Sequence, residues 1–281
     1  MAEAAARGGR AGSRPSRPRT VQPTRRHAKP TKRPAKKPGR LARLRVVPQA
    51  DAPHGRLGVL WAVPTVAAVV AGPVVLAVWM AAHAGLAGLQ AARSWPKSKA
   101  PNPVAVGIGA VLVPLGCAFG LPGAVVGLAV GGAVAAGLSQ GQAVGRAVTI
   151  ALALGAAAGS LVVARTVGVV PGLFLLGLVC AYDTGSYLVG TGAGSAWEGP
   201  AAGIAAMGPV TLLGATLAVP PFSESGPWIA GGLAALLAPV GPYAGSALLG
   251  SKKTRVPAVR RLDALLVLGP VWAVAAAVLT A

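Results

Sequence analysis

The sequence predicts an all-α, polytopic integral membrane protein with about nine transmembrane helices and a disordered basic N-terminal arm. Hydrophobic residues make up 54% of the 281 positions and charged residues only 11%, with a mean hydropathy of +0.64. These values lie outside the usual make-up of soluble domains. Apolar segments of membrane-spanning length follow one another from Leu57 to the end of the chain. We therefore predict two parts of the chain: a basic arm, residues 1–56, and a transmembrane domain, residues 57–281.

The arm, residues 1–56, holds sixteen of the 26 Lys and Arg residues. It has few aliphatic side chains before Leu41, so it cannot bury a core and is expected to be disordered. Its long basic stretch differs from a signal peptide. Three roles stay open: contact with anionic headgroups, sequence-independent RNA contact, and a solvated tail that only sets topology. The absence of aromatic residues disfavours the RNA role.

Proline and glycine divide the apolar remainder into crossings. The run 57–92 would be about 54 Å long as one helix at about 1.5 Å per residue, too long for a hydrocarbon core of about 30 Å. We therefore expect a hairpin that breaks at Gly72-Pro73, and a second tight turn at 119–123. The predicted crossings are 57–71, 73–92, 104–118, 121–138, 147–164, 167–181, 199–219, 228–249 and 262–281.

The positions of the basic residues predict which ends of the crossings face the cytoplasm. With the arm in the cytoplasm, 25 of the 26 Lys and Arg residues face the cytoplasm and only Arg165 lies on the other side. The sequence therefore predicts a multi-pass protein of the plasma (inner) membrane with a cytoplasmic N-terminus. Cys117 and Cys180 both fall inside apolar segments, where a cysteine is a small packing residue rather than half of a disulfide.

The acidic residues are scarce, six in all, so their positions are informative. Asp183 follows the apolar run 167–181 and is expected at, or just inside, the end of that helix. An ionisable group at such a depth is a candidate functional residue, and the alternative is a solvated aspartate in the headgroup layer. Glu198 and Asp263 are predicted on the same cytoplasmic face, whereas Glu224 falls in an outer loop.

Three carboxylates beside the basic loop 252–261 suggest a site for phosphorylated substrates. Asp183, Glu198 and Asp263 have the oxygen ligands that Mg²⁺ prefers, and cations in the loop can neutralise phosphates. Positive-inside topology alone would also place Lys and Arg there.

Two parts of the chain resemble the CDP-diacylglycerol synthases (phosphatidate cytidylyltransferases). Residues 183–187 read D-T-G-S-Y and 195–199 read S-A-W-E-G, which is similar to that family's N-D-T-x-A-Y and S-P-x-K-T-W-E-G. Residues 261–266 and 269–272, R-L-D-A-L-L and G-P-V-W, are similar to its R-x-D-S-L and P-V-F elements. The resemblance implies a nine-helix fold with a cytoplasmic site. It also implies catalytic and metal-binding roles for Asp183 and Asp263, and phosphate-binding roles for Ser195, Lys252, Lys253, Arg255, Arg260 and Arg261.

The chain departs from the family pattern at several positions. Gly241-Pro242 stands where the family has Gly-Asp, and Gly245 where a glutamate precedes serine. Arg260 replaces the first aspartate of the D-R-x-D element, and Tyr182 replaces the asparagine before Asp183. The lysine of S-P-x-K-T-W-E-G has no counterpart. Carboxylates that would hold the cation are thus missing, and the cation supplies most of such a reaction's charge neutralisation.

Three functions follow from these observations. The first is a non-catalytic or altered relative in phospholipid metabolism that binds phosphatidic acid or another anionic lipid. The second is an active enzyme that joins the CMP of CTP to phosphatidic acid with Mg²⁺ and releases pyrophosphate. A transporter that uses Asp183 as an ion site is a distant third. Membrane lipids are the expected partners, with CTP and Mg²⁺ only for the active enzyme and no nucleic acid; a homodimer stays open.

Overall fold

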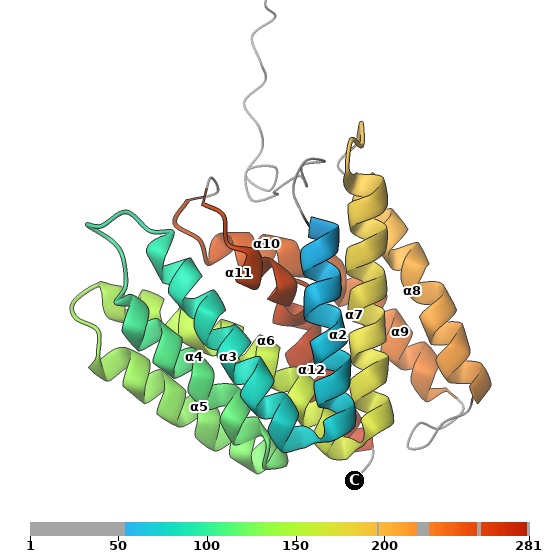
Figure 1. The fold of residues 1–281 in the computed structure, drawn as a ribbon, viewed down its shortest axis with the longest axis horizontal. Coiled ribbons are helices and arrows are strands. Elements are labelled where there is room, and N and C mark those ends of the chain that lie inside the picture. The colour runs from blue at the N-terminus through green and yellow to red at the C-terminus, as the bar shows by residue number, and fades with distance from the viewer. Residues whose placement is uncertain (1–53, 196, 218–224, 252–253, 280–281) are drawn as a thin grey trace, which may run out of the picture. The chain divides into compact units, whose positions relative to one another are not determined.

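The computed structural model describes residues 54–195, 197–217, 225–251 and 254–279, and every element in them is a helix. The elements are α2 (His54–Ala71), α3 (Pro73–Arg93), α4 (Pro103–Cys117), α5 (Gly120–Gly137), α6 (Ala143–Val167), α7 (Val169–Gly190), α8 (Glu198–Leu217), α9 (Gly226–Leu237), the 3-10 turn η1 (Ala238–Val240), α10 (Gly241–Ala247), α11 (Pro257–Leu262) and α12 (Leu265–Leu279) (Figure 1). Contacts divide the chain into Met1–Pro38 and Gly39–Ala281, and all described residues belong to the second unit. Most of the predicted arm, residues 1–53, lies outside the described residues.

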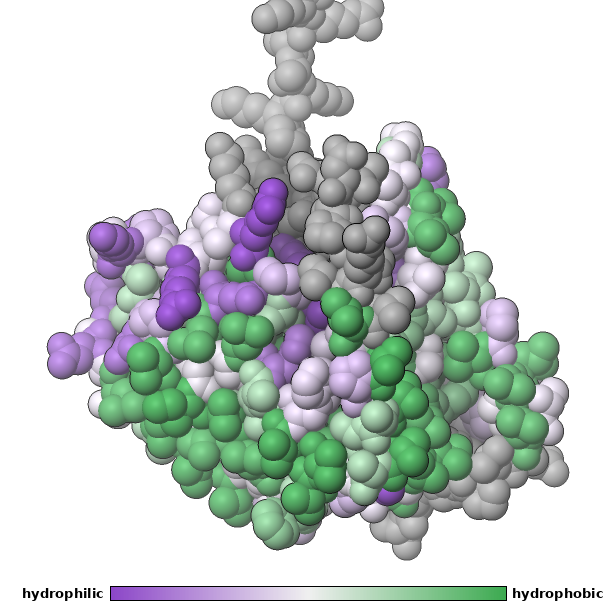
Figure 2. All heavy atoms as spheres, in the orientation of Figure 1, coloured by the Kyte–Doolittle hydropathy of each residue, from purple (hydrophilic) through white to green (hydrophobic). Residues whose placement is uncertain are grey.

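The described helices are those of an integral membrane protein. Six segments are long and apolar enough to cross a membrane: α3, α5, α6, α7, α8 and the combined segment 226–247. Large apolar side chains are exposed along them, including Val125 and Leu213 at 67% and 58%. Such exposure on consecutive turns is typical of a surface that lies in lipid. Figure 2 shows hydrophobic residues over the lower part of the visible face and hydrophilic residues toward its upper edge.

Glycine and proline end the helices where the sequence predicts. Gly72 has φ 133 between α2 and α3, and Pro73 begins α3. Gly120, with φ 71, begins α5 after a short turn from α4. These φ values lie in the left-handed region that glycine alone enters without strain. Both predicted hairpin breaks are therefore confirmed.

Small residues bring α4, α5 and α6 close together. A Cβ on Gly116, Gly127 or Gly131 would meet backbone atoms of the facing helix. On α6, a Cβ on Gly155 would lie 2.7 Å from the Val113 side chain. Close backbone approach between small residues is how helices associate in a membrane, where water gives no hydrophobic driving force. As a result α6 is the central helix, and 72% of an 18-residue apolar stretch of it is buried.

Three local predictions need correction. Helix α7 runs to Gly190, beyond the predicted end at residue 181, because nothing between them breaks a helix and Gly185 packs against the Ala202 carbonyl of α8. The crossing predicted at 228–249 bends at η1, where Pro239 lacks the N–H that a continuous helix needs. The predicted basic loop 252–261 contains the short helix α11.

Candidate functional site

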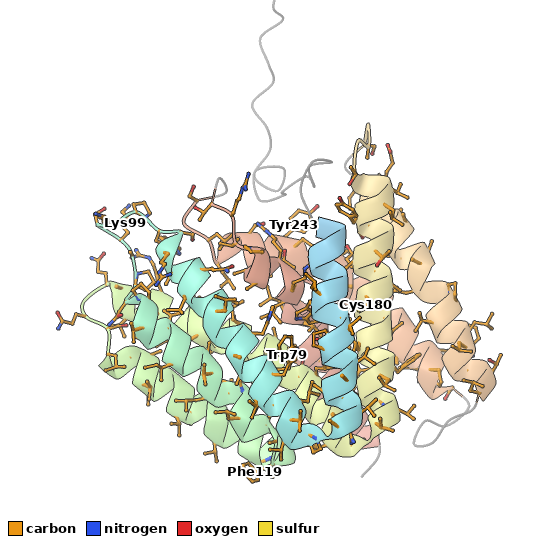
Figure 3. All side chains as sticks on the ribbon, viewed as in Figure 1. Trp79, Lys99, Phe119, Cys180 and Tyr243 are labelled. Atoms are coloured by element: carbon orange, nitrogen blue, oxygen red, sulfur yellow. The ribbon has the colours of Figure 1, made fainter. Side chains whose placement is uncertain are left out.

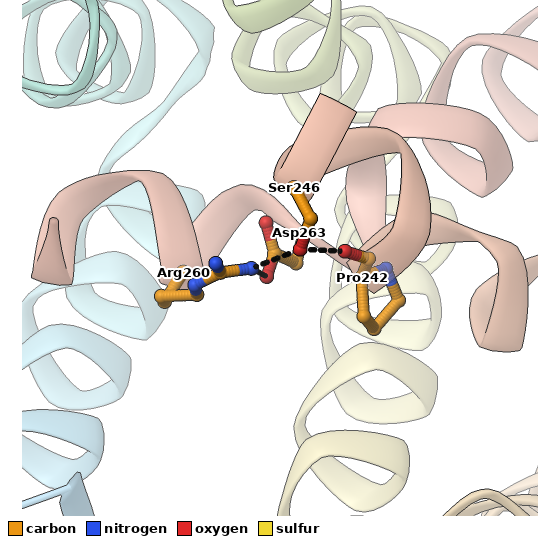
Figure 4. A network of polar contacts seen from close by, with 4 residues as sticks. All are labelled: Pro242, Ser246, Arg260 and Asp263. Atoms are coloured by element: carbon orange, nitrogen blue, oxygen red, sulfur yellow. Dashed lines mark hydrogen bonds and ion pairs between the residues drawn. The ribbon is translucent and has the colours of Figure 1, made fainter. Parts of the chain in front are cut away.

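Asp263, at the junction of α11 and α12, belongs to a polar network that Arg260 connects to α10 (Figure 4). Its Oδ2 forms an ion pair with Nη1 of Arg260 at 2.8 Å. The same Nη1 donates to Oγ of Ser246 at 3.2 Å, and Ser246 Oγ donates to the Pro242 carbonyl at 2.7 Å. The second carboxylate oxygen, Oδ1, is buried and has no hydrogen-bond partner among the described residues. The network therefore fixes one side of the carboxylate and leaves the other unpaired.

Two glycines one helical turn apart on α10 make room for Asp263. A Cβ on Gly241 would meet the Asp263 backbone carbonyl, and a Cβ on Gly245 would meet Asp263 Oδ1. The residue spacing i, i+4 puts both glycines on one face of α10. Any larger residue at either position would push Asp263 out of its place.

Helix α11 is held on α3 by side chains within the apolar interior. Gln90 Oε1 accepts from the Ala258 backbone N–H at 3.0 Å, and His83 Nε2 lies 3.1 Å from the Ala258 carbonyl. The Ala258 N–H is one of the first in a short helix, so it has no helical partner and Gln90 satisfies it. The side chains of Val259 and Leu262 on α11 are buried as well. In this way α3 sets where Arg260 and Arg261 stand.

The structure places Asp183 within electrostatic range of Asp263 and Arg261. Asp183 lies on α7 inside the helix, half-buried, and both Asp263 and Arg261 act on it electrostatically. Arg261 also lies against α2, where its Nη1 would be 3.1 Å from a Cβ on Gly58. We call Asp183, Arg260, Arg261 and Asp263 the charge cluster. Its two carboxylates and two guanidinium groups have no net charge when all four are ionised.

Burial dominates the electrostatics of Asp263, which precedes α12 and lies outside the six membrane-length segments. Removal from water raises the pKa of its carboxyl from the ordinary value of 3.8 to about 6. The Arg260 charge and hydrogen bond oppose this and lower the pKa. The ion pair thus offsets only part of the desolvation cost.

The other predicted site residues lie apart from the charge cluster or outside the described residues. Glu198, in the first turn of α8, is exposed, and Ser195 Oγ accepts from the Trp197 N–H at 3.3 Å in the α7–α8 loop. Arg255 is exposed before α11, and Lys252 and Lys253 lie outside the described residues. Among the described residues, no three His, Cys, Asp or Glu side chains come together as a metal-ion site. Asp183 and Asp263 therefore have no third such ligand there.

Sequence reasoning missed the residues that hold the cluster in place. His83, Gln90 and Ser246 are isolated polar residues in apolar segments. Each becomes important only through a neighbour far along the chain. The one available signal was the rarity of polar side chains in membrane-length helices.

No protein-family model, curated protein or solved structure matches this chain. The resemblance to CDP-diacylglycerol synthases therefore depends on the quoted residues alone.

Proposed function

We propose that the chain is a membrane-embedded relative of the CDP-diacylglycerol synthases that does not transfer cytidylyl groups and that binds phosphatidic acid or another anionic lipid. One observation supports this most: Asp263 occupies the space that a side chain at 245 would need, with one oxygen ion-paired to Arg260. A residue so placed is poorly available as a metal ligand.

The chemistry of cytidylyl transfer explains why the poor availability of Asp263 as a metal ligand argues against catalysis. Transfer of a nucleotidyl group depends on a cation that neutralises the phosphates and the pyrophosphate leaving group. The family's glutamate position is Gly245, which has no ligand atoms in its side chain. Arg260 stands at another of its carboxylate positions and pairs with Asp263 at 2.8 Å. Arginine in place of a carboxylate favours binding of phosphate over binding of a metal ion.

The experiment uses full-length protein purified in detergent. Radiolabelled CTP, phosphatidic acid and Mg²⁺ or Mn²⁺ are supplied, and CDP-diacylglycerol is measured by chromatography beside an active synthase. We expect no product, together with retention of phosphatidic acid that weakens in the Arg260→Gln/Arg261→Gln double variant. Retention that is unchanged in the double variant, or absent in the wild type, would contradict the lipid-binding role.

A second function is favoured by the approach of Asp183 to Asp263. In its support, the Asp263 carboxylate acts electrostatically on Asp183, and two carboxylates close enough to share Mg²⁺ would be the minimum for this role. Under this alternative, the protein makes CDP-diacylglycerol with Asp183 and Asp263 as ligands and Arg260 and Arg261 on the phosphates. Product formation that Asp183→Asn abolishes would establish the enzyme and refute the non-catalytic proposal.

For the topology we propose nine crossings with a cytoplasmic N-terminus in the plasma membrane. The crossings are α2, α3, α4, α5, α6, α7, α8, the bent segment 226–247 and α12. In support, Lys99, between α3 and α4, lies at the upper left of the helices in Figure 3, and Phe119, between α4 and α5, lies at their lower end. Successive loops on opposite edges are what alternating crossings produce.

A further inference from the structure

A Trp–Arg pair joins three segments at one end of the helices, apart from the charge cluster. The guanidinium carbon of Arg146, in the first turn of α6, lies 5.1 Å from the ring centroid of Trp95. Arg146 Nη1 donates to the Lys99 carbonyl at 3.1 Å. The guanidinium is thus stacked on one side and hydrogen-bonded at one nitrogen, which fixes its orientation.

The tryptophan is itself anchored. Its Nε1 donates to the Leu248 carbonyl at 3.1 Å, and Gly250 lies against its ring, where a Cβ would be 2.7 Å from Cγ. The Ser94 hydroxyl accepts from the Gly250 N–H at 3.0 Å. The α3–α4 loop is therefore attached to the segment after α10, and the Trp95 ring is held in place before any ligand binds.

The described surroundings of this pair are positively charged. Arg93 ends α3, Lys97 and Lys99 follow it in the α3–α4 loop, and all three are exposed. Within the part of the chain that the structure describes, no carboxylate pairs with Arg146 or with the loop cations. Most of the donors of the Arg146 guanidinium remain available, because one of its N–H groups is used.

We infer that Trp95, Lys97, Lys99 and Arg146 form a headgroup surface, which binds the phosphate of an anionic bilayer phospholipid. The surface lies where α3, a membrane-length helix, ends at Arg93 and where α6 begins. Tryptophan prefers the membrane–water interface, and an oriented guanidinium binds a phosphodiester through two parallel hydrogen bonds. The inference does not depend on the proposed function, because it uses no residue of the charge cluster.

The test is native mass spectrometry of the full-length protein from detergent micelles doped with equal amounts of phosphatidylglycerol and phosphatidylcholine. The wild type should carry phosphatidylglycerol in preference to phosphatidylcholine. Each near-surface cation strengthens contact with anionic lipid, so Arg146→Gln should weaken the phosphatidylglycerol adduct about fivefold. The Lys97→Gln/Lys99→Gln variant should weaken it further, and Arg146→Lys should restore part of it. Thermal unfolding confirms that each variant is folded.

Arg93→Gln is the matched control, because Arg93 is an exposed cation at the end of α3 that is not part of the proposed surface, and its loss should change the adduct less than twofold. An equal loss in the Arg93 and Arg146 variants would mean diffuse charge attraction and would overturn the site. Equal amounts of the two lipids on the wild type would also overturn it. The proposal would also be wrong if Arg146→Gln weakened the binding of a short single-stranded RNA but left the binding of phosphatidylglycerol unchanged. If millimolar inorganic phosphate alone displaces the lipid, the surface is a site for free phosphate, and the proposal of a lipid ligand is wrong.

Discussion

Asp263 shows how one residue can be fixed by the absence of side chains. Gly241 and Gly245 leave the space that its backbone carbonyl and Oδ1 occupy, while Arg260 holds Oδ2. Because Oδ1 is buried and has no hydrogen-bond partner in the part of the chain that the structure describes, the charged form is poorly solvated. The carboxyl consequently has a raised pKa, and this gives a signature in solution.

We predict that Asp263 makes stability depend on pH. Its pKa rises from 3.8 to about 6 on folding, so below about pH 4 its contribution to stability is fully present. Between about pH 4 and 6 the folded protein retains a proton that the unfolded chain has released, so stability falls as pH rises. Thermal unfolding in detergent should show this decline in the wild type relative to Asp263→Asn. Glu198→Gln, which changes an exposed acid, should keep the wild-type profile; identical profiles for wild type and Asp263→Asn would contradict the prediction.

At the scale of the helix, the position of Arg165 is explained by its contact with the end of α2. Its Nε donates to the Val69 carbonyl at 2.6 Å. That carbonyl is one of the last of α2, and the residue four positions later, Pro73, has no N–H to offer. Within a bilayer such a group has no water to bind. The single cation predicted on the far side thus caps a helix rather than facing solvent alone.

Arg165→Leu should therefore lower the free energy of unfolding by about 1 to 3 kcal/mol, the usual cost of a buried carbonyl left unpaired. Arg165→Lys should have an intermediate effect, because it retains the charge but not the planar donor group. Unfolding in mixed detergent micelles measures both variants. A leucine variant as stable as the wild type would show that the Val69 carbonyl finds another donor.

The contact between α4 and α5 gives a second prediction for helices. A Cβ on Gly127 would lie 2.9 Å from the Val113 carbonyl oxygen and 3.0 Å from that of Leu112, both backbone atoms that cannot rotate away. Gly127→Ala should destabilise the protein by about 1 to 3 kcal/mol. Gly137, on the same helix, has nothing within 4 Å of its Cβ position, so Gly137→Ala should be neutral or stabilise by up to about 1 kcal/mol. Equal effects of the two substitutions would disprove the close contact.

At the scale of the whole molecule, charge and helix order together determine topology. With nine crossings the two ends of the chain lie on opposite sides of the membrane. A reporter fused after Ala281 should lie outside the cell and one inserted near Ser98 in the cytoplasm, as alkaline phosphatase and green fluorescent protein fusions would measure. The reason for the proposed orientation is that basic residues flanking membrane helices favour the cytoplasmic side. A cytoplasmic signal from the C-terminal fusion would contradict nine crossings.

Much of the helical layout could be predicted from the sequence, because its causes are local. Apolar runs identify helices of membrane length, and Gly72-Pro73 breaks a run whatever surrounds it. The end of α7 could not be predicted, since glycine within a helix reads as a possible break. Gly185 instead serves packing against α8, a fact that depends on a neighbour elsewhere in the chain.

For the candidate site, too, some features could be predicted from the sequence and others could not. Scarcity of acids identified Asp183 and Asp263, because a carboxylate in an apolar chain is informative wherever it lies. Only the tertiary structure decided that Arg260 pairs with Asp263, that Gly245 makes room for it, and that Glu198 lies on an exposed turn away from both. These outcomes depend on how α10 packs against α11 and α12 and on how α11 packs against α3. Ion pairing and steric fit are properties of distances between residues far apart in sequence, which composition and spacing do not contain.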